Sequence, residues 1–197
     1  MDLMRSDRSL FFSGFMKNPR AVGAILPSSP FLTEEILSCI DWDRLQAIAE
    51  IGPGTGPFTR GIVERCRENT RFFAVEIDPQ FVEHLTARFP GLDIVQADAS
   101  QLVELCTQRG IAALDAVISG LPWAVFSNEL QRKLLTSIFD SLASHGTFST
   151  FAYLHGLQLS AGKRFREMLH ERFSSVEISR VVWRNVPPAI VYHCRKN

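Results

Sequence analysis

The residues of this sequence that most clearly could bind a ligand are three acids at the ends of predicted β-strands. A glycine-rich turn lies beside the first of them. Glu50 opens the turn, which reads Glu50-Ile51-Gly52-Pro53-Gly54-Thr55-Gly56. Glu76 and Asp98 stand at the ends of the next two predicted strands. Glycines let a backbone turn tightly and approach a ligand, and carboxylates accept hydrogen bonds from ligand hydroxyl and amino groups. Because the carboxyl ends of parallel strands share one edge of a sheet, these groups are expected to form one ligand site.

The spacing of the glycines separates two kinds of ligand. A dinucleotide-binding turn follows G-x-G-x-x-G and places a pyrophosphate at a helix N-terminus. In this chain the third glycine, Gly56, comes one residue early, and Pro57 stands at the dinucleotide position. The pattern E-x-G-x-G-x-G instead resembles the loop that binds S-adenosylmethionine (SAM) in class I methyltransferases, and this resemblance implies SAM as the cofactor.

The same resemblance implies a role for each group. Glu50 would face the cationic methionine part of SAM, Glu76 would accept hydrogen bonds from both ribose hydroxyls, and Asp98 would lie near the adenine amino group. An ordinary turn, a helix cap or a solvated acid is the alternative for each feature taken singly. The implied cofactor-binding residues are Glu50, Gly52, Gly54, Gly56, Glu76, Asp98 and Gly120.

The elements that must position these residues alternate between strand and helix after residue 45, which predicts a parallel sheet covered by helices. The last two predicted strands are too close in sequence for a helical crossover and should form an antiparallel hairpin. The predicted fold is therefore α/β: a Rossmann-like class I methyltransferase with a seven-stranded, mostly parallel sheet, an antiparallel last strand and helices on both faces. Residues 1–40 are predicted as N-terminal helices and 41–197 as the SAM-dependent methyltransferase domain. The predicted strands are 47–51, 71–77, 92–97, 114–119, 147–153, 176–183 and 190–194, and the helices include 57–67, one starting at 78–79, 101–109 and 127–142.

A second motif, Ser119-Gly120-Leu121-Pro122-Trp123, follows the fourth predicted strand. Methyltransferases that act on amino groups often carry N-L-P-[YF] or [DN]-P-P-[YF] there, with polar groups for the target amine and a ring that stacks on a base. The region resembles rRNA adenine dimethylases, except that Gly120 replaces the asparagine. The chain also has 21 basic and 21 acidic residues, whereas nucleic-acid binders usually carry a basic excess. No nucleic-acid partner is predicted.

Two further segments resemble a different family. Residues 18–30 read NPRAVGAILPSSP and residues 182–189 read VWRNVPPA. Together with Gly120-Leu121-Pro122-Trp123 and Phe151-Ala152-Tyr153 they resemble bacterial phospholipid N-methyltransferases (phosphatidylethanolamine N-methyltransferases), over about residues 10 to 195. The resemblance implies SAM-dependent methylation of phosphatidylethanolamine and its methylated intermediates towards phosphatidylcholine. The alternatives are an rRNA adenine-N6 methyltransferase, a small-molecule amine methyltransferase, and a SAM-binding module without catalysis.

Methyl transfer to a neutral amine depends mainly on positioning and on the exclusion of water, and no residue stands out as a general base. Tyr153 and Trp123 are the predicted catalytic residues, which would orient the amine and line an aromatic cage for its growing positive charge. A packed aromatic is the alternative for Tyr153, and a surface loop residue for His155, the second candidate for proton relay. The lipid phosphate needs a cation, and the predicted substrate-binding residues are Arg184 first, then Arg180, Lys17 and Arg20.

No apolar run approaches the ~20 residues that span a bilayer, and the four cysteines form no metal-ligand pair. We therefore expect a cytoplasmic protein without a metal site. It would bind phospholipid, with help from anionic lipids, at the inner face of the cell membrane. A helix over residues 3–17 would place Met4, Phe11 and Phe15 on one face, which could meet lipid; packing as a lid over SAM is the alternative.

Overall fold

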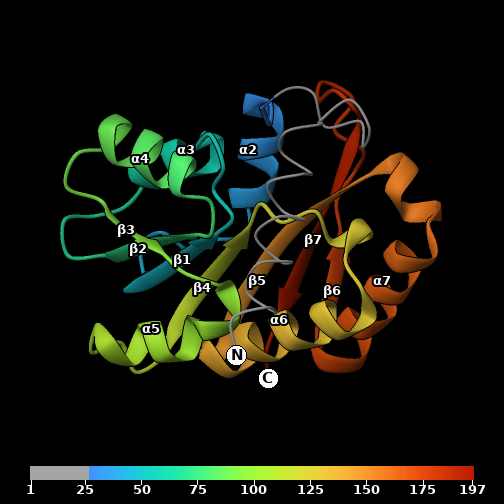
Figure 1. Cartoon of the computed structure of the whole chain (residues 1–197). Coiled ribbons are helices and arrows are strands. Elements are labelled where there is room, and N and C mark those ends of the chain that lie inside the picture. The colour runs from blue at the N-terminus through green and yellow to red at the C-terminus, as the bar shows by residue number, and fades with distance from the viewer. Residues whose placement is uncertain (1–26) are drawn as a thin grey trace.

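The computed structural model describes residues 27–197, and in this part of the chain a seven-stranded sheet lies between two layers of helices (Figure 1). The order of the strands across the sheet is β3-β2-β1-β4-β5-β7-β6. This arrangement confirms the predicted seven-stranded sheet. The strands are β1 (Ala47–Ile51), β2 (Arg71–Glu76), β3 (Asp93–Gln96), β4 (Leu114–Ser119), β5 (Leu142–Tyr153), β6 (Ser175–Ile178) and β7 (Ala189–Arg195).

The directions of the strands also agree with the sequence. Strands β1 to β5 pair in parallel, whereas β7 runs antiparallel between β5 and β6, so the predicted terminal hairpin is confirmed. All five residues of β1 are buried, which is why the strand reads as a nearly continuous apolar run. Strand β5 begins at Leu142, five residues before the predicted start, and its pairing with β4 shifts register near Leu114. The segment over residues 142–146 has no strand-like alternation that would have revealed this extension.

The helices begin where the sequence offers caps. Asp78 accepts a hydrogen bond from the backbone N–H of Gln80 at 2.8 Å, and Pro79 occupies the first helical position, as predicted. The helix that follows the glycine turn ends at Val63, four residues earlier than expected. The α-helices are α2 (Pro30–Leu37), α3 (Pro57–Val63), α4 (Pro79–Arg88), α5 (Leu102–Gln108), α6 (Asn128–Ser141) and α7 (Ser160–Arg172); short 3₁₀ helices are η2 (Ala99–Gln101), η3 (Trp123–Val125) and η4 (Leu154–Gln158).

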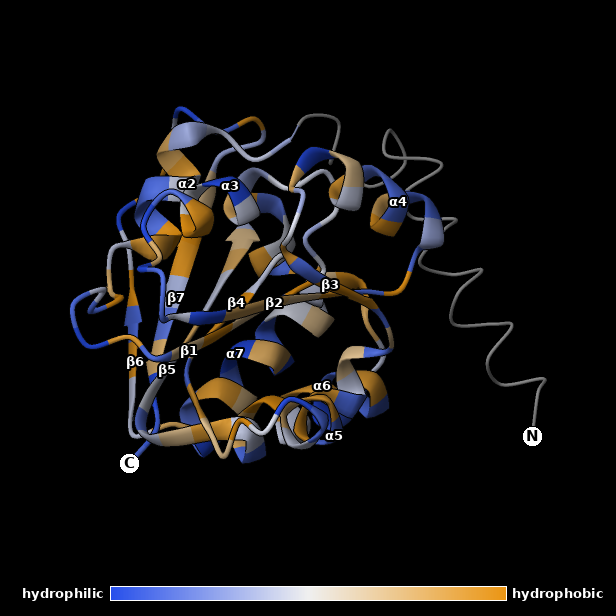
Figure 2. Cartoon of the chain, turned by 90° about the vertical axis from the view of Figure 1, so that its left-hand side faces the viewer, coloured by the Kyte–Doolittle hydropathy of each residue, from blue (hydrophilic) through white to orange (hydrophobic). Residues whose placement is uncertain are grey.

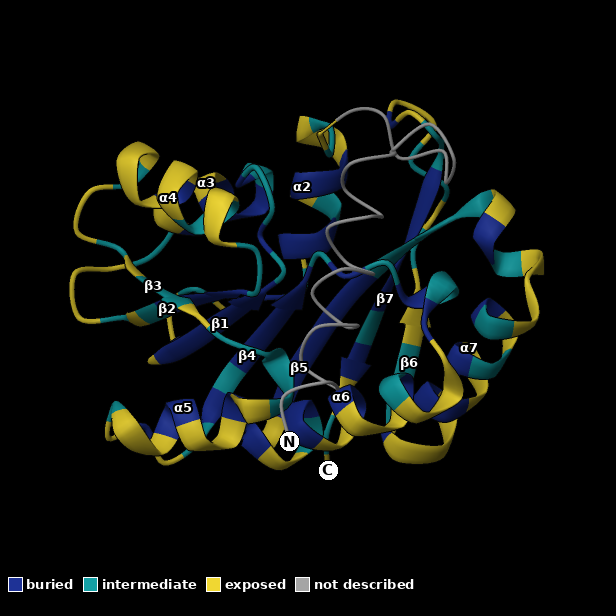
Figure 3. Ribbon diagram, viewed as in Figure 1, coloured by how far each residue is buried: buried dark blue, intermediate teal, exposed yellow. Residues whose placement is uncertain are grey.

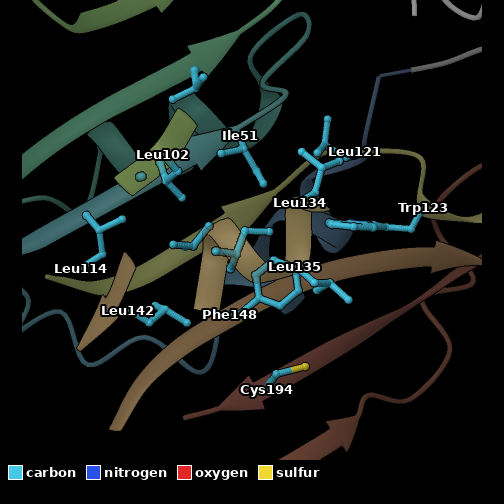
Figure 4. Packing of buried hydrophobic residues seen from close by; sticks show 14 of the residues in the cluster. Ile51, Leu102, Leu114, Leu121, Trp123, Leu134, Leu135, Leu142, Phe148 and Cys194 are labelled. Atoms are coloured by element: carbon cyan, nitrogen blue, oxygen red, sulfur yellow. The ribbon is translucent and has the colours of Figure 1, made fainter. Parts of the chain in front are cut away.

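Each face of the sheet has its own apolar core. Helices α5, α6 and α7 cover one face, where Figure 4 shows the packed side chains around Phe148 and Trp123. Helices α2 and α3 cover the other, where Leu32 and Ile36 are fully buried. Figure 2 shows that the apolar residues gather between the layers, and Figure 3 shows the central strands buried beneath partly exposed helices.

The position of α2 bears on the predicted domain boundary. The prediction separates residues 1–40 from the methyltransferase domain, whereas α2 packs into the core of that domain through Leu32, Ile36 and Leu37. Helix α2 is thus an integral layer of the fold. The predicted amphipathic helix over residues 3–17 lies outside the described residues.

Candidate active site

The glycine turn after β1 is held against β2. The N–H of Gly52 donates to the carbonyl of Val75 at 2.9 Å, and the N–H of Gly54 donates to the carboxylate of Glu76 at 3.1 Å. Gly54 has a positive φ of 57°, and a side chain built there would meet no described atom within 4 Å. The backbone at Gly54 therefore borders open space, as a ligand cradle requires.

Glu76 ends β2 beneath this turn and is only 1% exposed. Its carboxylate accepts hydrogen bonds from three backbone N–H groups: those of Gly54, Ile77 at 2.8 Å and Asp78 at 3.0 Å. Burial raises the pKa of Glu76, while these three donors oppose the rise. A carboxylate offers about four acceptor positions, so Glu76 is held rigidly and still has capacity for a ligand hydroxyl.

Glu50 lies on β1 and is fully buried. One carboxylate oxygen accepts a hydrogen bond from the hydroxyl of Thr59, on α3, at 2.6 Å, and the other has no partner among the described residues. Burial raises the pKa of Glu50 to about 8, and the nearby charge of Glu76 adds to the rise. A buried carboxyl with an unsatisfied oxygen is costly, and a bound ammonium group would offset that cost.

A pocket of about 300 Å³ opens beside the turn. Gly52, Glu76 and Asp98 are all part of its lining, so the structure brings together predicted residues from three consecutive strand ends. Asp98 also caps η2, accepting a hydrogen bond from the N–H of Ser100 at 2.8 Å. The remaining lining is largely apolar and comes from β2, the β4–α6 loop and α6: it includes Val75, Leu121, Phe126, Leu130 and Leu134. Such a mixture suits a flat, partly polar ring system.

Gly120 supports this pocket without belonging to its lining. Its N–H donates to the carbonyl of Ile51 at 2.9 Å. A side chain at this position would come within 2.3 Å of the carbonyl oxygen of Gly52. The β4–α6 loop therefore packs against the glycine turn so closely that the asparagine of the dimethylase motif would not fit at this position.

The structure corrects the predicted place of Trp123. Its side chain lies among the packed apolar residues (Figure 4) and is 2% exposed. It stacks on Phe165 with ring centroids 4.3 Å apart and donates its indole N–H to the hydroxyl of Ser119 at 3.1 Å. Gln131 donates to the carbonyl of Trp123 at 2.7 Å. The ring is thus satisfied inside the core under α6 and α7, and it does not line an open cage.

Tyr153 lies on the other face of the sheet, so the predicted two-ring cage of Trp123 and Tyr153 is not formed. Tyr153 is half-buried at the carboxyl end of β5, where its ring meets Phe151 edge-on at 5.2 Å and stacks on His155 at 5.6 Å. Burial raises the pKa of Tyr153, which keeps the phenol protonated at neutral pH. Strand β5 is two strands from β1 in the sheet, a separation of roughly 10 Å.

Two of the four predicted substrate-binding cations, Arg180 and Arg184, lie in the β6–β7 connection, which leads to the strand end beside Tyr153. Tyr153 pairs with Ala189 at the start of β7, and the N–H of Leu154 donates to the carbonyl of Pro188 at 3.0 Å. Arg180 and Arg184 are exposed in this connection, and the guanidinium of Arg184 lies 4.4 Å from the ring centre of Phe31. Lys17 and Arg20 lie outside the described residues.

The pocket, the glycine turn and the sheet together define a class I SAM-dependent methyltransferase. The chain matches the model of the ribosomal RNA adenine dimethylase family over residues 16–139 and belongs to this family. It is also 34% identical over 192 residues to the ornithine lipid N-methyltransferase of Singulisphaera acidiphila, an alignment that covers 96% of both chains.

An rRNA methyltransferase and a solved N-methyltransferase structure also resemble this chain. The chain is 32% identical over 128 residues to the ribosomal RNA small subunit methyltransferase A of Mycoplasma mycoides, covering 62% of this chain and 46% of that protein. Among solved structures, the N-methyltransferase NodS of Bradyrhizobium japonicum in complex with S-adenosyl-L-homocysteine has a TM-score of 0.62 at 15% identity, covering 85% of this chain and 88% of its own. These likenesses agree with the SAM-dependent methyltransferase fold and with SAM as the cofactor.

Within residues 27–197 no helix is long and apolar enough to cross a membrane. In the same range, no group of three or more His, Cys, Asp or Glu side chains is arranged to hold a metal ion.

Proposed function

We propose that this chain transfers the methyl group of SAM to the primary amine of a membrane lipid headgroup. The observation that carries this proposal is the full-length match to the ornithine lipid N-methyltransferase, which extends over 96% of both chains. Because the alignment covers nearly the whole chain, it also covers the β6–β7 connection with Arg184 and the strand end with Tyr153. Phosphatidylethanolamine, expected from the sequence, and ornithine lipid both offer a primary amine, and assays on vesicles of defined composition separate them.

The cofactor site supports this proposal through its fit to SAM. The unpartnered oxygen of Glu50 suits the ammonium group of the methionine part, the carboxylate of Glu76 suits the ribose, and the apolar pocket beside Asp98 suits adenine. When bound, SAM supplies an electrophilic methyl group on a positively charged sulfur. The chain itself contributes rigid placement of the cofactor in a largely apolar pocket, and positioning is a main source of rate in such a displacement.

The amine would approach across the carboxyl ends of β4 and β5. The protonated phenol of Tyr153 can accept a hydrogen bond from the incoming amine, and the faces of Tyr153 and His155 can attract the cationic methylated product. The amine must lose one proton for each methyl group it gains, and the exposed imidazole of His155 is the group proposed to pass it to solvent. Arg184 is the proposed partner of the lipid anion.

An rRNA adenine is the second candidate substrate, favoured by the family match over residues 16–139. Three features of this chain favour the lipid. Gly120 replaces the asparagine of the dimethylase motif, the Trp123 ring is buried at 2% exposure and cannot stack on a base in this arrangement, and basic and acidic residues balance at 21 each. Lipid is therefore the leading proposal.

The test is transfer of isotopically labelled methyl from SAM to defined vesicles. Three vesicle preparations contain phosphatidylethanolamine, ornithine lipid or only phosphatidylcholine, and a fourth reaction contains small-subunit rRNA. We expect label in the extracted lipid from one or both aminolipid vesicles, with none in phosphatidylcholine. The matched control is Glu76→Ala, which should abolish transfer. Label in RNA with unlabelled lipids would overturn the lipid proposal in favour of the second candidate.

A further inference from the structure

Two segments that are distant in the sequence form one apolar and cationic surface near the end of β5. The connection before β7 exposes Trp183 (70%) and Val186 (62%), and the start of α2 exposes Phe31 (46%). Arg184 joins them, because its guanidinium lies 4.4 Å from the Phe31 ring centre. We call Phe31, Trp183, Arg184 and Val186 the aromatic patch. Figure 1 shows the start of α2 close to the connection that leads into β7.

The aromatic patch is rigidly supported from below by Asn185. This side chain is 2% exposed, accepts a hydrogen bond from the N–H of Ser29 at 2.9 Å, and donates to the carbonyl of Pro187 at 2.7 Å. Ser29 in turn caps α2 by accepting from the N–H of Leu32 at 3.2 Å. One buried amide therefore fixes the connection to α2 while the neighbouring Trp183 and Val186 side chains remain exposed. The exposure of these apolar groups is a property of an ordered loop.

The charged residues of the two segments that form this surface are all basic. Residues 179–188 contain Arg180 and Arg184 and no acid, and residues 27–33 contain no charged residue. Below the patch, the nearest acid along α2, Glu34, is paired with Arg65 at 2.6 Å. An exposed tryptophan beside arginine and aliphatic side chains matches the composition of membrane interfaces, where amphipathic rings lie at headgroup depth and cations meet anionic lipids.

The location of the patch connects it to the site. The connection leads directly into Ala189, which pairs with Tyr153, and Val182 bridges to Ala189 on the same strand end. A surface that covers Trp183 and Val186 therefore lies next to the strand end where Tyr153 would receive the amine. A lipid headgroup could reach Tyr153 while its acyl chains stay in the bilayer.

We propose that the aromatic patch docks this protein on an anionic lipid membrane. Trp183 and Val186 insert to headgroup depth, and Arg184 lies among lipid phosphates. This inference rests on the proposed function, because it explains how an aminolipid reaches the site. It assigns the membrane contact to described residues of α2 and the β6–β7 connection.

The direct test uses Trp183 as its own reporter. The full chain is mixed with vesicles that contain phosphatidylglycerol and carry bromine at a shallow acyl position. Trp123 is buried at 2% exposure and Trp42 is partly buried, so quenching by the vesicles should come chiefly from Trp183. We expect quenching that disappears in Trp183→Phe. Quenching that is unchanged in that variant would overturn the proposal.

A matched pair of variants then tests the patch by binding. Val186→Ser removes an apolar group from the patch, and Val103→Ser makes the same change at a 43% exposed site on α5, in the other helical layer. We expect Trp183→Ala to weaken vesicle binding about tenfold or more and Val186→Ser about fivefold. Arg184→Gln should weaken it about fivefold on anionic vesicles only. Equal effects of Val186→Ser and Val103→Ser would contradict the assignment, as would concentration-dependent self-association that Trp183→Ala abolishes.

Activity separates this inference from the proposed function. On a short-chain aminolipid dissolved as monomers, Trp183→Ala should turn over like the unaltered chain, whereas on vesicles its rate should fall with its binding. Loss of both rates in a folded variant would overturn docking, because the residue would then act within the site. If the unaltered chain methylates no aminolipid but Trp183 is still quenched, the proposed function fails while docking stands.

Discussion

Among single residues, Glu50 shows a conflict between stability and binding. Its carboxyl group is fully buried, has one hydrogen bond from Thr59, and leaves one oxygen unsatisfied among the described atoms. The pKa rises to about 8 from an ordinary value of 4.5, mainly through burial. The group therefore destabilises the unliganded fold and becomes favourable only when a cation arrives.

The first prediction is that Glu50→Gln stabilises the unliganded protein. The unfolded chain ionises this acid near pH 4.5 while the folded chain holds it protonated up to about pH 8. The contribution of the protonated Glu50 carboxyl to the free energy of unfolding is therefore fully present below pH 4.5 and is lost as pH rises towards 8. At pH 7 the removal of this penalty should be worth on the order of 3 kcal/mol. Chemical denaturation at pH 5 and pH 7 measures it, and a gain that is equal at both values would contradict burial of an ionisable carboxyl as the cause.

The second prediction concerns the pH dependence of SAM binding. The ionised form of Glu50 is the one that a ligand ammonium favours, so affinity should rise by up to about tenfold per pH unit between pH 6 and 8. Above that range the ligand ammonium, with an ordinary pKa near 8, loses its own proton and affinity should fall again. Calorimetry in buffers of different ionisation enthalpy should detect proton release near pH 7. In Glu50→Gln the rising limb should be absent.

Trp123 supplies a third prediction for a single residue. Its indole ring stacks on Phe165 and its N–H is bonded to Ser119. Trp123→Phe should keep the ring packing, lose one buried hydrogen bond, and cost about 1–3 kcal/mol of stability. Methyl transfer per folded molecule should be unchanged. A large fall in kcat with an intact fold would instead give Trp123 a catalytic role.

Among the structural elements, the β4–α6 loop and the glycine turn depend on each other. Gly120 packs on the carbonyl of Gly52, while Gln131 on α6 holds the following turn through the carbonyl of Trp123. Short loops tied in this way can carry a ligand site at the carboxyl ends of neighbouring strands.

The fourth prediction follows from that contact. Gly120→Asn restores the dimethylase residue but would place its Cβ about 2.3 Å from the Gly52 oxygen, so it should displace the turn and weaken SAM binding about tenfold or more. The control is Gly91→Asn, at an exposed turn with a positive φ of 87° and open space around it. Titration with SAM measures both, and unchanged affinity in Gly120→Asn would contradict the packing argument.

In the molecule as a whole, a cofactor in the pocket would contact several elements that do not all contact one another in the sheet. The pocket takes its lining from the glycine turn, β2, the β3–η2 junction, the β4–α6 loop and α6. A ligand that binds only this assembled form must raise the stability of the fold by mass action.

The fifth prediction measures that linkage. At a SAM concentration a hundred times its Kd, the chain should gain about 2.7 kcal/mol, which corresponds to roughly 5–10 °C in Tm for a domain of this size. Glu76→Ala should lose most of this gain. Thermal scans with and without ligand provide the comparison, and an equal shift in both proteins would remove Glu76 from the cofactor site.

Much of the fold is predictable from the sequence because its signals are local. The apolar run over residues 47–51, the cap at Asp78-Pro79 and the short connection before β7 each specify an element within a few residues. Strand β5 is longer than predicted, because its first five residues pair through a register shift that no local pattern records. Glu76 and Asp98 line one pocket, as expected because parallel strands bring their carboxyl ends together, whereas Glu50 is buried beside Thr59 and is not part of that lining.

The order of amino acids is enough to specify the succession of strands and helices, the glycine turn and the acids beside it. Which side chains meet across the sheet is specified only by packing in three dimensions. That packing buries Trp123 under α6 and α7, leaves Tyr153 on the opposite face, and exposes Trp183 beside Phe31. Alternation along a strand separates two faces but does not say which layer covers each of them. The covering layer depends on contacts between residues more than a hundred positions apart, such as the hydrogen bond from Ser29 to Asn185.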